Sequence, residues 1–427
     1  SLYIYTYGAN FSVDNGKIYD PNGREFIPKG ANVYCWNMCW GKQLNPIETL
    51  DEFVNCWKFN TARIYARLHP QPGCSDNPPY TIKTKEGFFE VVDSFSARGV
   101  VSIIDPHDHI CGYYSGSELN ELVEFMKEAA QRYIDNPYVW FEVQNEPGAH
   151  QSTSTSQWYT VCHAVIKAVR GEGNKNIIAI PAYNCGQDFG GSSSSSSLLN
   201  HADDAATVEG KKAENIVLKY HVYDQWSGRS VSAFKAYVSR LNDMGYPVYV
   251  GEYGSENSGA GGANSWSASR NMLKAHQDLE MGRIVWSWYG GDGNRLVVRN
   301  PAGCLIPPLG CRGWLIDDCE NPTNLSDLGK LVWEDQHREE DLEYLPGYPL
   351  SAIKRPEQKL QNNKSITIRD IGIDPFTGMA FIDGKQVKIV SISGKAIQTP
   401  ANRLPAGIYG IHFPDSPGST AFFFLRG

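Results

Sequence analysis

Two glutamates occupy equivalent places after apolar segments that are typical of buried strands. Glu146 follows residues 139–143 in VWFEVQNEPG, and Glu252 follows residues 247–251 in VGEYG. If both segments belong to one barrel of alternating strands and helices, their carboxyl ends lie on its catalytic face. Two carboxylates facing one cleft can cleave a glycosidic bond, because one protonates the leaving sugar while the other attacks the anomeric carbon. The competing interpretation of Glu146 is an exposed loop glutamate.

The two carboxyl groups need different environments, because one must stay protonated while the other stays ionised. Arg63, in NTARIYAR, would keep Glu252 charged if the two side chains meet. Tyr223 could donate a hydrogen bond to the same carboxylate. Asn145 could bind the 2-hydroxyl of the sugar, a contact that strengthens in the transition state. The alternative role of Arg63 is a buried structural ion pair.

Further polar and aromatic side chains fall at the carboxyl ends of other predicted strands. Taken singly, such a histidine is more often a structural hydrogen-bonding residue, and such a tryptophan can simply fill the barrel. Their convergence on one rim favours a binding site in which a tryptophan lies under the sugar ring. The set comprises His107 and His109 in DPHDH, His221 with Tyr223 in YHVYD, and Trp286 with Trp288 on one face of VWSWYG.

Strand and helix patterns alternate along most of the chain. The alternation predicts an α/β protein built on a (β/α)₈ TIM barrel. A doubly wound open sheet is the alternative, but no glycine-rich phosphate turn follows an early strand. The predicted strands are 26–32, 61–65, 100–105, 139–143, 177–182, 216–220, 247–251 and 284–288, and the predicted helices are 46–59, 86–98, 117–133, 157–170, 231–244, 265–279 and 328–345.

Two segments outside this alternation have distinct patterns. Residues 11–27 contain two Asn-Gly pairs and predict a small hairpin that closes one end of the barrel. The serine tract 192–197 is typical of a mobile loop.

The composition changes near residue 350 and predicts three parts. Residues 1–350 form the catalytic barrel with its N-terminal hairpin, 351–365 form a linker, and 366–427 form a small β-sandwich module of short strands and turns.

Charge and hydropathy exclude two classes of partner. The net charge of −8 and the isoelectric point near 5.7 argue against nucleic-acid binding. No run of about 18 apolar residues occurs, so no membrane span is expected. Ten cysteines are scattered without CxxC spacing, which favours disulfides and an extracellular location over a set of buried thiols. Cys304 and Cys311 could form one such bond. The chain opens on Ser1, as expected if a leader has been removed.

The motif set resembles glycoside hydrolase family five, which belongs to a clan of retaining (β/α)₈ glycosidases. The similarity spans roughly residues 11–290 and includes NEP, GEYG, NTARI, DPHDH and HVY. The resemblance implies that Glu146 is the acid/base and Glu252 the nucleophile. It also implies a supporting shell of Arg63, His107, Asn145, His221, Tyr223 and Trp286, with Trp288 as the alternative tryptophan.

The tail has a resemblance of its own. VKIVSISGKAI followed by LPAGIYGIHF is similar to the C-terminal sorting domain of the type nine secretion system. The alternatives are a carbohydrate-binding module and an inert β-sandwich.

The resulting hypothesis is a secreted, monomeric, retaining endo-β-1,4-glycanase that needs no metal or cofactor. Its substrate would be plant cell-wall polysaccharide, with cellulose or β-glucan preferred. The alternatives are an endo-β-1,4-mannanase of the same fold and mechanism, and a non-catalytic carbohydrate-binding barrel. A third is a metal-dependent hydrolase with zinc bound by His107, Asp108 and His109.

Overall fold

The computed structural model describes residues 10–37, 45–70, 82–150, 153–254, 265–288, 294–298 and 315–338, and five strands between residues 371 and 425. The chain forms two compact units, one of residues 11–348 and one of residues 1–10 with 349–427. Cys304 and Cys311, for which a disulfide is predicted, lie outside the described residues.

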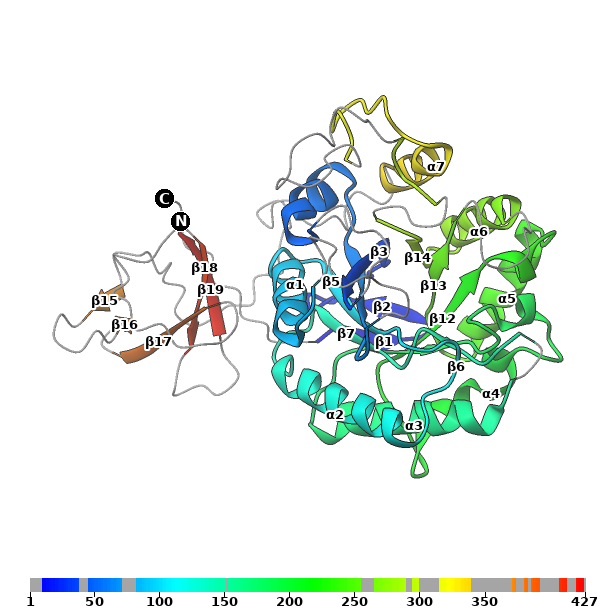
Figure 1. Cartoon of the computed structure of the whole chain (residues 1–427), viewed down its shortest axis with the longest axis horizontal. Coiled ribbons are helices and arrows are strands. Elements are labelled where there is room, and N and C mark those ends of the chain that lie inside the picture. Colours follow the sequence, from blue (N-terminus) through cyan, green and yellow to red (C-terminus); the bar gives the residue numbers. More distant parts are fainter. Residues whose placement is uncertain are drawn as a thin grey trace. The chain divides into compact units, whose positions relative to one another are not determined.

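Eight parallel strands close into a barrel in chain order, which confirms the predicted (β/α)₈ fold (Figure 1). Nearly all of their residues are buried, as expected for strands that helices cover on the outside and side chains fill on the inside. The strands are β3 (Lys29–Trp36), β4 (Thr61–Ala66), β5 (Val101–Pro106), β7 (Val139–Glu142), β9 (Ile178–Pro181), β12 (Ile216–Val222), β13 (Val248–Tyr253) and β14 (Gly282–Val285).

Helices surround the barrel in Figure 1, and each buries an apolar stripe against the strands. Several begin with a serine or threonine whose side chain accepts a hydrogen bond from a first-turn N–H group, as Thr84 does for α1 and Ser154 for α3. The helices are α1 (Lys85–Ala97), α2 (Gly116–Arg132), α3 (Thr155–Gly171), α4 (Ser197–Ala206), α5 (Val231–Asp243), α6 (Trp266–Asp278) and α7 (Asp327–Gln336). None of these described helices is long and apolar enough to serve as a membrane span.

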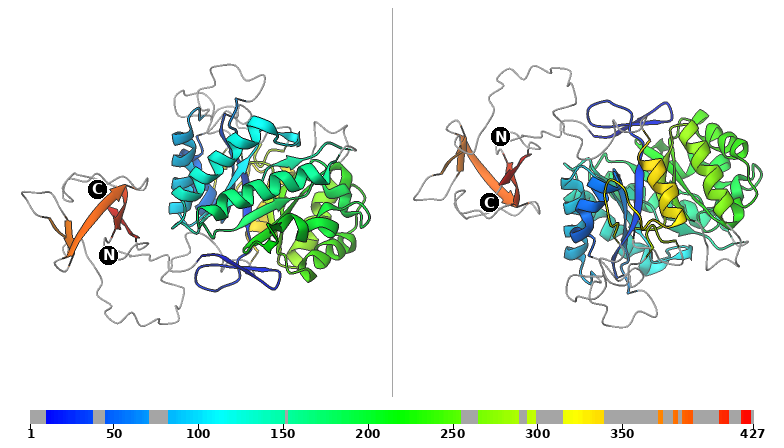
Figure 2. Two further views of the ribbon diagram at one scale, coloured as in Figure 1. Left: turned by 90° about the horizontal axis from the view of Figure 1, so that it is seen from below. Right: turned by 90° about the horizontal axis from the view of Figure 1, so that it is seen from above.

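The N-terminal hairpin closes one end of the barrel, as predicted. Strands β1 (Ser12–Asp14) and β2 (Lys17–Tyr19) pair around Asn15-Gly16, both of which have positive φ. In Figure 2 the hairpin is the dark-blue ribbon beyond one end of the barrel. Phe11 and Phe26 pack edge-to-face on Trp140 inside the barrel. The opposite end, to which the strands' carboxyl ends point, therefore remains for the site.

The serine tract forms a turn over residues 192–196, as the predicted loop requires, and leads directly into helix α4, while its mobility stays a prediction. Asp188, in the short 3-10 helix η3 (Asp188–Gly191), is fully buried and accepts hydrogen bonds from the Ser197 backbone N–H and hydroxyl, both at 2.6 Å. It also accepts from Ser196 and, at 2.7 Å, from the Tyr237 hydroxyl. The Ser196 side chain caps the amino end of α4, a helix that is absent from the prediction.

Other boundaries also differ from the prediction. The expected helix 46–59 consists of a 3-10 turn, η1 (Ile47–Thr49), followed by η2 (Glu52–Cys56), a π-helix. Short elements absent from the prediction lie at the rim and on the surface. They are β6 (Ile110–Gly112), β8 (Glu146–Pro147), β10 (Thr207–Val208), β11 (Lys211–Lys212) and η4 (Asp224–Trp226).

The C-terminal unit contains a five-stranded antiparallel sheet in the order β15-β16-β17-β18-β19. A second sheet packed against it, which a β-sandwich requires, stays a prediction. The strands are β15 (Ile371–Ile373), β16 (Ala380–Ile382), β17 (Lys385–Ser391), β18 (Gly407–His412) and β19 (Thr420–Leu425).

The described cysteines fall into both predicted classes. Disulfides join Cys56 to Cys319 and Cys111 to Cys185. Cys35 and Cys162 are buried free thiols. Burial raises the pKa of both thiols, so they are unreactive core residues rather than nucleophiles.

We expect Asp188→Ala to lower the free energy of unfolding by about 3 kcal/mol, because it leaves several buried donors without an acceptor. Ser193→Ala removes an exposed hydroxyl from the same tract and should change stability by less than about 0.5 kcal/mol. Chemical denaturation of both variants provides the measurement. Equal stabilities would show that the Asp188 contacts do not organise the tract.

Candidate active site

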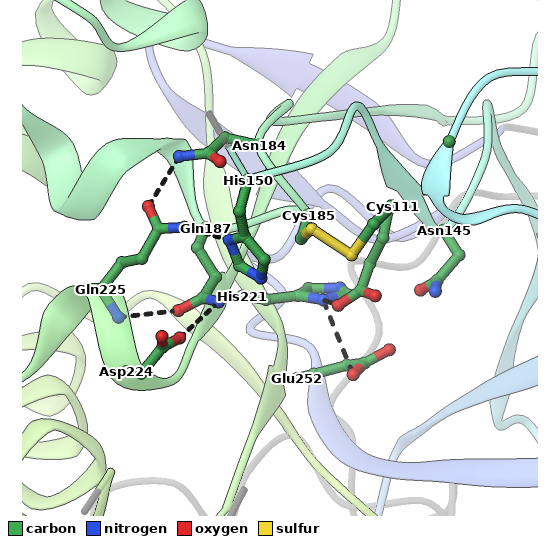
Figure 3. Close-up of a disulfide and its surroundings, with 12 residues drawn as sticks. Cys111, Asn145, His150, Asn184, Cys185, Gln187, His221, Asp224, Gln225 and Glu252 are labelled. Atoms are coloured by element: carbon green, nitrogen blue, oxygen red, sulfur yellow. Dashed lines mark hydrogen bonds and ion pairs between the residues drawn. A yellow bond between two sulfur atoms is a disulfide. The ribbon is translucent and has the colours of Figure 1, made fainter. Parts of the chain in front are cut away.

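His221 lies between the two glutamates at the carboxyl end of the barrel. Its Nδ1 atom is 2.8 Å from Glu146 Oε1 and 3.6 Å from Glu252 Oε2. Figure 3 shows the His221 ring facing Glu252. A carboxylate oxygen of Glu146 and one of Glu252 lie within 4.8 Å of each other. The two predicted carboxylates therefore face one another across the barrel mouth.

Arg63 occupies the centre of the site and is fully buried. Its Nε atom donates to Glu142 at 2.8 Å. Its Nη1 atom donates to Asn32 at 2.9 Å and to Glu252 at 2.7 Å. Its Nη2 atom donates to Glu142 at 2.8 Å and to Asn145 at 2.7 Å. All five N–H groups of the guanidinium are thus satisfied, which fixes the Glu252 carboxylate in position.

The environments of the two glutamates differ in the sense that acid and nucleophile require. Burial, and then the charge of Glu252, holds the pKa of Glu146 well above the usual range for a glutamate. Burial also raises the pKa of Glu252, but Arg63, His107 and Lys219 oppose that shift. Of Glu146 and Glu252, only Glu252 contacts the guanidinium directly, so Glu252 is the carboxyl that ionises first. Glu146 is the one kept protonated.

The remaining polar residues predicted for the site converge on this pair. Tyr223 donates a hydrogen bond to Glu252 Oε2 at 3.0 Å. Asn145 accepts from Arg63 through its side-chain oxygen, so its amide N–H groups are directed elsewhere, one of them toward His107 Nε2 at 3.4 Å. His107 Nδ1 is held by Asp105 at 2.8 Å. Asn145 can therefore offer an N–H donor to a sugar hydroxyl.

The structure separates the two tryptophans that the sequence predicts on one face. The Trp286 ring lies among inward-facing side chains, 5.5 Å from the Tyr65 ring and 6.1 Å from the His107 ring. Trp288 instead donates to Thr49 Oγ1 at 3.0 Å and packs on Phe53 in the outer core. Strand β14 ends at Val285, so the period-two alternation does not extend to Trp288. Trp286 is the tryptophan at the site.

The sequence analysis missed a layer of buried charge beneath the two glutamates. Its members are Asp105 on β5, Glu142 on β7 and Lys219 on β12, each with a side chain that is 0% exposed. Asn32 on β3 joins them through Arg63. The sequence signal for two of them is a charged residue inside an apolar segment, Glu142 in VWFEV and Lys219 in IVLKYHV.

The zinc ligands of the alternative hypothesis are not brought together. His107 points inward to Asp105, whereas His109 lies 3.2 Å from Glu118 on the rim. Asp108 accepts from the backbone N–H groups of Leu68 and His69, both at 2.9 Å. Among the described residues, Glu146, His221 and Glu252 could hold a cation. Acid/base cleavage by two carboxyl groups uses the same atoms without one.

A disulfide joins Cys111 to Cys185 near His221 (Figure 3) and supports the segments that carry Glu146 and His221. Cys111 lies on β6, which pairs with β8 so that Ile110 faces Glu146. The Cys185 backbone N–H donates to Gly148 O at 2.7 Å. The carbonyl of Gly186, the next residue, accepts from the His221 N–H at 2.8 Å. The Cys111–Cys185 bond therefore ties together the loops on the Glu146 side of the site.

The chain belongs to glycosyl hydrolase family 5: the model of that family, described as cellulase, matches residues 19–292. A mannan endo-1,4-beta-mannosidase of Cellvibrio japonicus is 23% identical over 67% of this chain and 60% of its own length. Endoglucanase Z of Dickeya dadantii is 27% identical over 59% of this chain and 54% of its own length. The chain thus spans little more than half the length of these relatives.

Solved structures share the fold. The catalytic domain of Thermobifida fusca endoglucanase Cel5A matches with a TM-score of 0.58 at 21% identity, over 78% of this chain and 98% of that one. The catalytic domain of a mannanase from Streptomyces sp. SirexAA-E matches with a TM-score of 0.55 at 20% identity, over 77% and 90%.

If Glu146 is the general acid, Glu146→Gln should lower kcat by about 10²–10⁴-fold. If Glu252 is the nucleophile, Glu252→Gln should cost at least as much, because an amide cannot form the covalent intermediate. Glu124→Gln, which changes an exposed glutamate of α2, is the control and should retain wild-type turnover. Steady-state assays on a soluble glycan provide the test, and near-full turnover by Glu252→Gln would contradict the assignment.

Replacing both Cys111 and Cys185 by serine should lower stability by about 2–5 kcal/mol. It should also lower kcat by about 10-fold, because the Glu146 loop loses its anchor. The matched control replaces Cys56 and Cys319, a disulfide outside the site, and should lower the melting temperature without lowering kcat. An equal loss of kcat in both pairs would refute the positioning role of Cys111–Cys185.

Proposed function

We propose that the chain is a retaining endo-β-1,4-glycanase. The observation that carries the proposal is the placement of Glu146 and Glu252 on either side of His221, with their carboxylate oxygens within 4.8 Å. Retaining glycosidases hold the two carboxyl groups about 5–5.5 Å apart, whereas inverting enzymes leave roughly 6.5–9.5 Å for a water molecule. The short separation supports direct attack by one carboxylate.

In the first step, ionised Glu252 attacks the anomeric carbon while Glu146 donates its proton to the departing glycosidic oxygen. Arg63 and Tyr223 hold the attacking carboxylate in one orientation. In the second step, Glu146 removes a proton from a water molecule, and the resulting hydroxide displaces Glu252 from the sugar. Each step inverts the anomeric carbon, so the product retains the β configuration.

His221 fits this cycle because its ring is neutral. Burial, followed by the charges of Lys219 and Arg63, holds the pKa of His221 well below its usual value. A neutral imidazole can share a hydrogen bond at Nδ1 with Glu146 in both of its protonation states, because the ring and the carboxyl can each act as donor. The ring thus orients Glu146 without fixing its charge.

For the substrate we propose the β-1,4-linked backbone of a plant cell-wall polysaccharide, with cellulose or β-glucan preferred. A mannan backbone is the second candidate, because mannan endo-1,4-beta-mannosidases and endoglucanases both occur among the relatives. Rates on cellulose, mixed-linkage glucan, xyloglucan, xylan and mannan distinguish them. Sugar binding without release of reducing ends would favour a non-catalytic barrel.

We also propose that the protein is secreted. Two disulfides in the described part of the catalytic unit are typical of an oxidising compartment. The segment resembling a type nine sorting domain is the candidate signal in the C-terminal unit. Deleting residues 366–427 should then leave the enzyme inside cells that export the full chain. Unchanged export would assign the tail another role.

The stereochemistry of the product provides a direct test. Proton NMR of a fresh digest, recorded before mutarotation, should show the β-anomer first. A 2-deoxy-2-fluoro glycoside inactivator should label Glu252, which mass spectrometry of the digested protein would locate. An initial α-anomer would indicate a single displacement and remove Glu252 from the nucleophile role.

A further inference from the structure

Lys219 is a buried lysine inside the barrel. Residues two apart in a strand face the same side, so Lys219 lies one layer below His221 on β12. Its side chain is 0% exposed. Removing an ammonium from water costs several kcal/mol unless its partners compensate. An apolar residue would satisfy the packing of this position, so the charge itself requires an explanation.

Both hydrogen-bond partners of Lys219 belong to the segment that leads to Glu146. The Nζ atom lies 2.5 Å from Glu142 Oε1 on β7. It also donates to the main-chain oxygen of Asn145 at 2.6 Å. Asn145 directly precedes Glu146, and its backbone N–H is held by Pro106 O at 2.9 Å. The lysine therefore anchors the carbonyl of the peptide unit from which Glu146 projects.

The stem of Lys219 packs against the segment that leads to Glu252. A Cβ atom placed on Gly251 would lie 2.4 Å from Lys219 Cδ and 3.1 Å from His221 Nε2. Gly251 is thus the residue that lets the lysine pass against the backbone of β13. Because Glu252 follows directly, Lys219 contacts the segments that lead to both paired carboxyl groups.

We propose that Lys219 is a positioning residue for this reaction: its ammonium fixes the Asn145–Glu146 peptide relative to Glu252 and supplies positive charge beneath both carboxyl groups. The proposal rests on the proposed glycanase function, because it assigns a role in the same reaction. Lys219 makes no hydrogen bond to Glu146 or Glu252. It therefore acts on them through Glu142, through Asn145 and through the electric field of its charge.

The charge balance of the layer explains why a cation is needed. Burial lowers the pKa of Lys219, but the carboxylates of Glu142, which accepts a hydrogen bond from Nζ, and Asp105 oppose that shift and favour the ammonium form. Without this charge, a single guanidinium would face the surrounding carboxylates, and protons would be taken up more readily. The titratable groups around Lys219 are Arg63 on β4, Asp105 on β5, Glu142 on β7, Glu146 on β8, Glu252 on β13 and His221 on β12.

The test compares Lys219→Met with Lys29→Met. Lys29 is also a buried lysine of a barrel strand, but it donates to Asp335 O at 2.9 Å, from the amino end of β3. Both variants should lose stability. Only Lys219→Met should lower kcat, on the order of 10- to 100-fold, because only this variant loosens a reacting group.

The pH profile separates positioning from general destabilisation. Loss of the ammonium disfavours the ionised form of Glu252, so the acid limb of kcat/KM should move to higher pH by about one unit in Lys219→Met. Lys219→Arg restores the charge and should return that limb toward its wild-type position, while Lys29→Met should not move it. A Lys219→Met profile that coincides with the wild type, or an equal shift in Lys29→Met, would overturn the proposal.

A measurement on the unmodified protein covers the case in which Lys219→Met does not fold. The protein is prepared with ¹⁵Nζ-lysine, and the Lys219 resonance is assigned by its absence from Lys219→Arg. This resonance should shift when 2-deoxy-2-fluoro-β-cellobioside esterifies Glu252. An unchanged resonance in protein whose Glu252 has been esterified would overturn the role of Lys219. Failure of every tested glycan and inactivator to react with wild type would instead refute the proposed function.

Discussion

The site depends on one buried cation whose hydrogen-bonding capacity is fully used. Arg63 makes five hydrogen bonds to four residues, which come from β3, β7, the turn after β7, and β13. A buried guanidinium is costly unless each N–H finds an acceptor, and removing one partner leaves an uncompensated charge. The geometry of the guanidinium therefore determines where several strand ends can lie. Glu252 occupies one of those fixed positions.

This constraint also separates the two glutamates chemically. Glu252 is buried, the Glu146 side chain is only 12% exposed, and both lie near His221, so loss of solvent alone would raise the two pKa values together. Direct contact with Arg63 breaks that symmetry, because it favours the charged form of Glu252 more strongly than that of the more distant Glu146. Glu146 has no guanidinium contact and shares its hydrogen bond with a neutral imidazole. The proposed acid and the proposed nucleophile thus differ through one ion pair rather than through opposite surroundings.

The barrel and the strand-end residues could be predicted because both follow from periodicity. Glu146, Glu252 and His221 each follow an apolar run, and the carboxyl ends of parallel strands share one rim. Trp288 was misplaced because alternation holds only while the strand continues, and β14 stops before both tryptophans. Helix α4 is absent from the prediction because it is short and begins at the last residue of a serine tract that has the pattern of a loop. The buried Asp188 that orders it acts through tertiary contacts that propensity does not contain.

Buried ionic residues were the hardest part of the site to predict, and the reason is physical. Strands are predicted from runs of apolar residues, and Glu142 and Lys219 interrupt such runs. An isolated charge inside a barrel would be unstable, so neither residue is expected there on its own. The two charges compensate each other only in the folded structure, where Lys219 Nζ lies 2.5 Å from the Glu142 carboxylate. Such pairs add little net stability compared with apolar residues of the same size. Their contribution is orientation, because charges and dipoles held in place before the substrate arrives need no reorganisation when charge develops at the reacting sugar. The ionic layer of this barrel thus supplies fixed charge beneath two carboxyl groups that must ionise differently. The core is less stable than it would be with apolar residues in the same places.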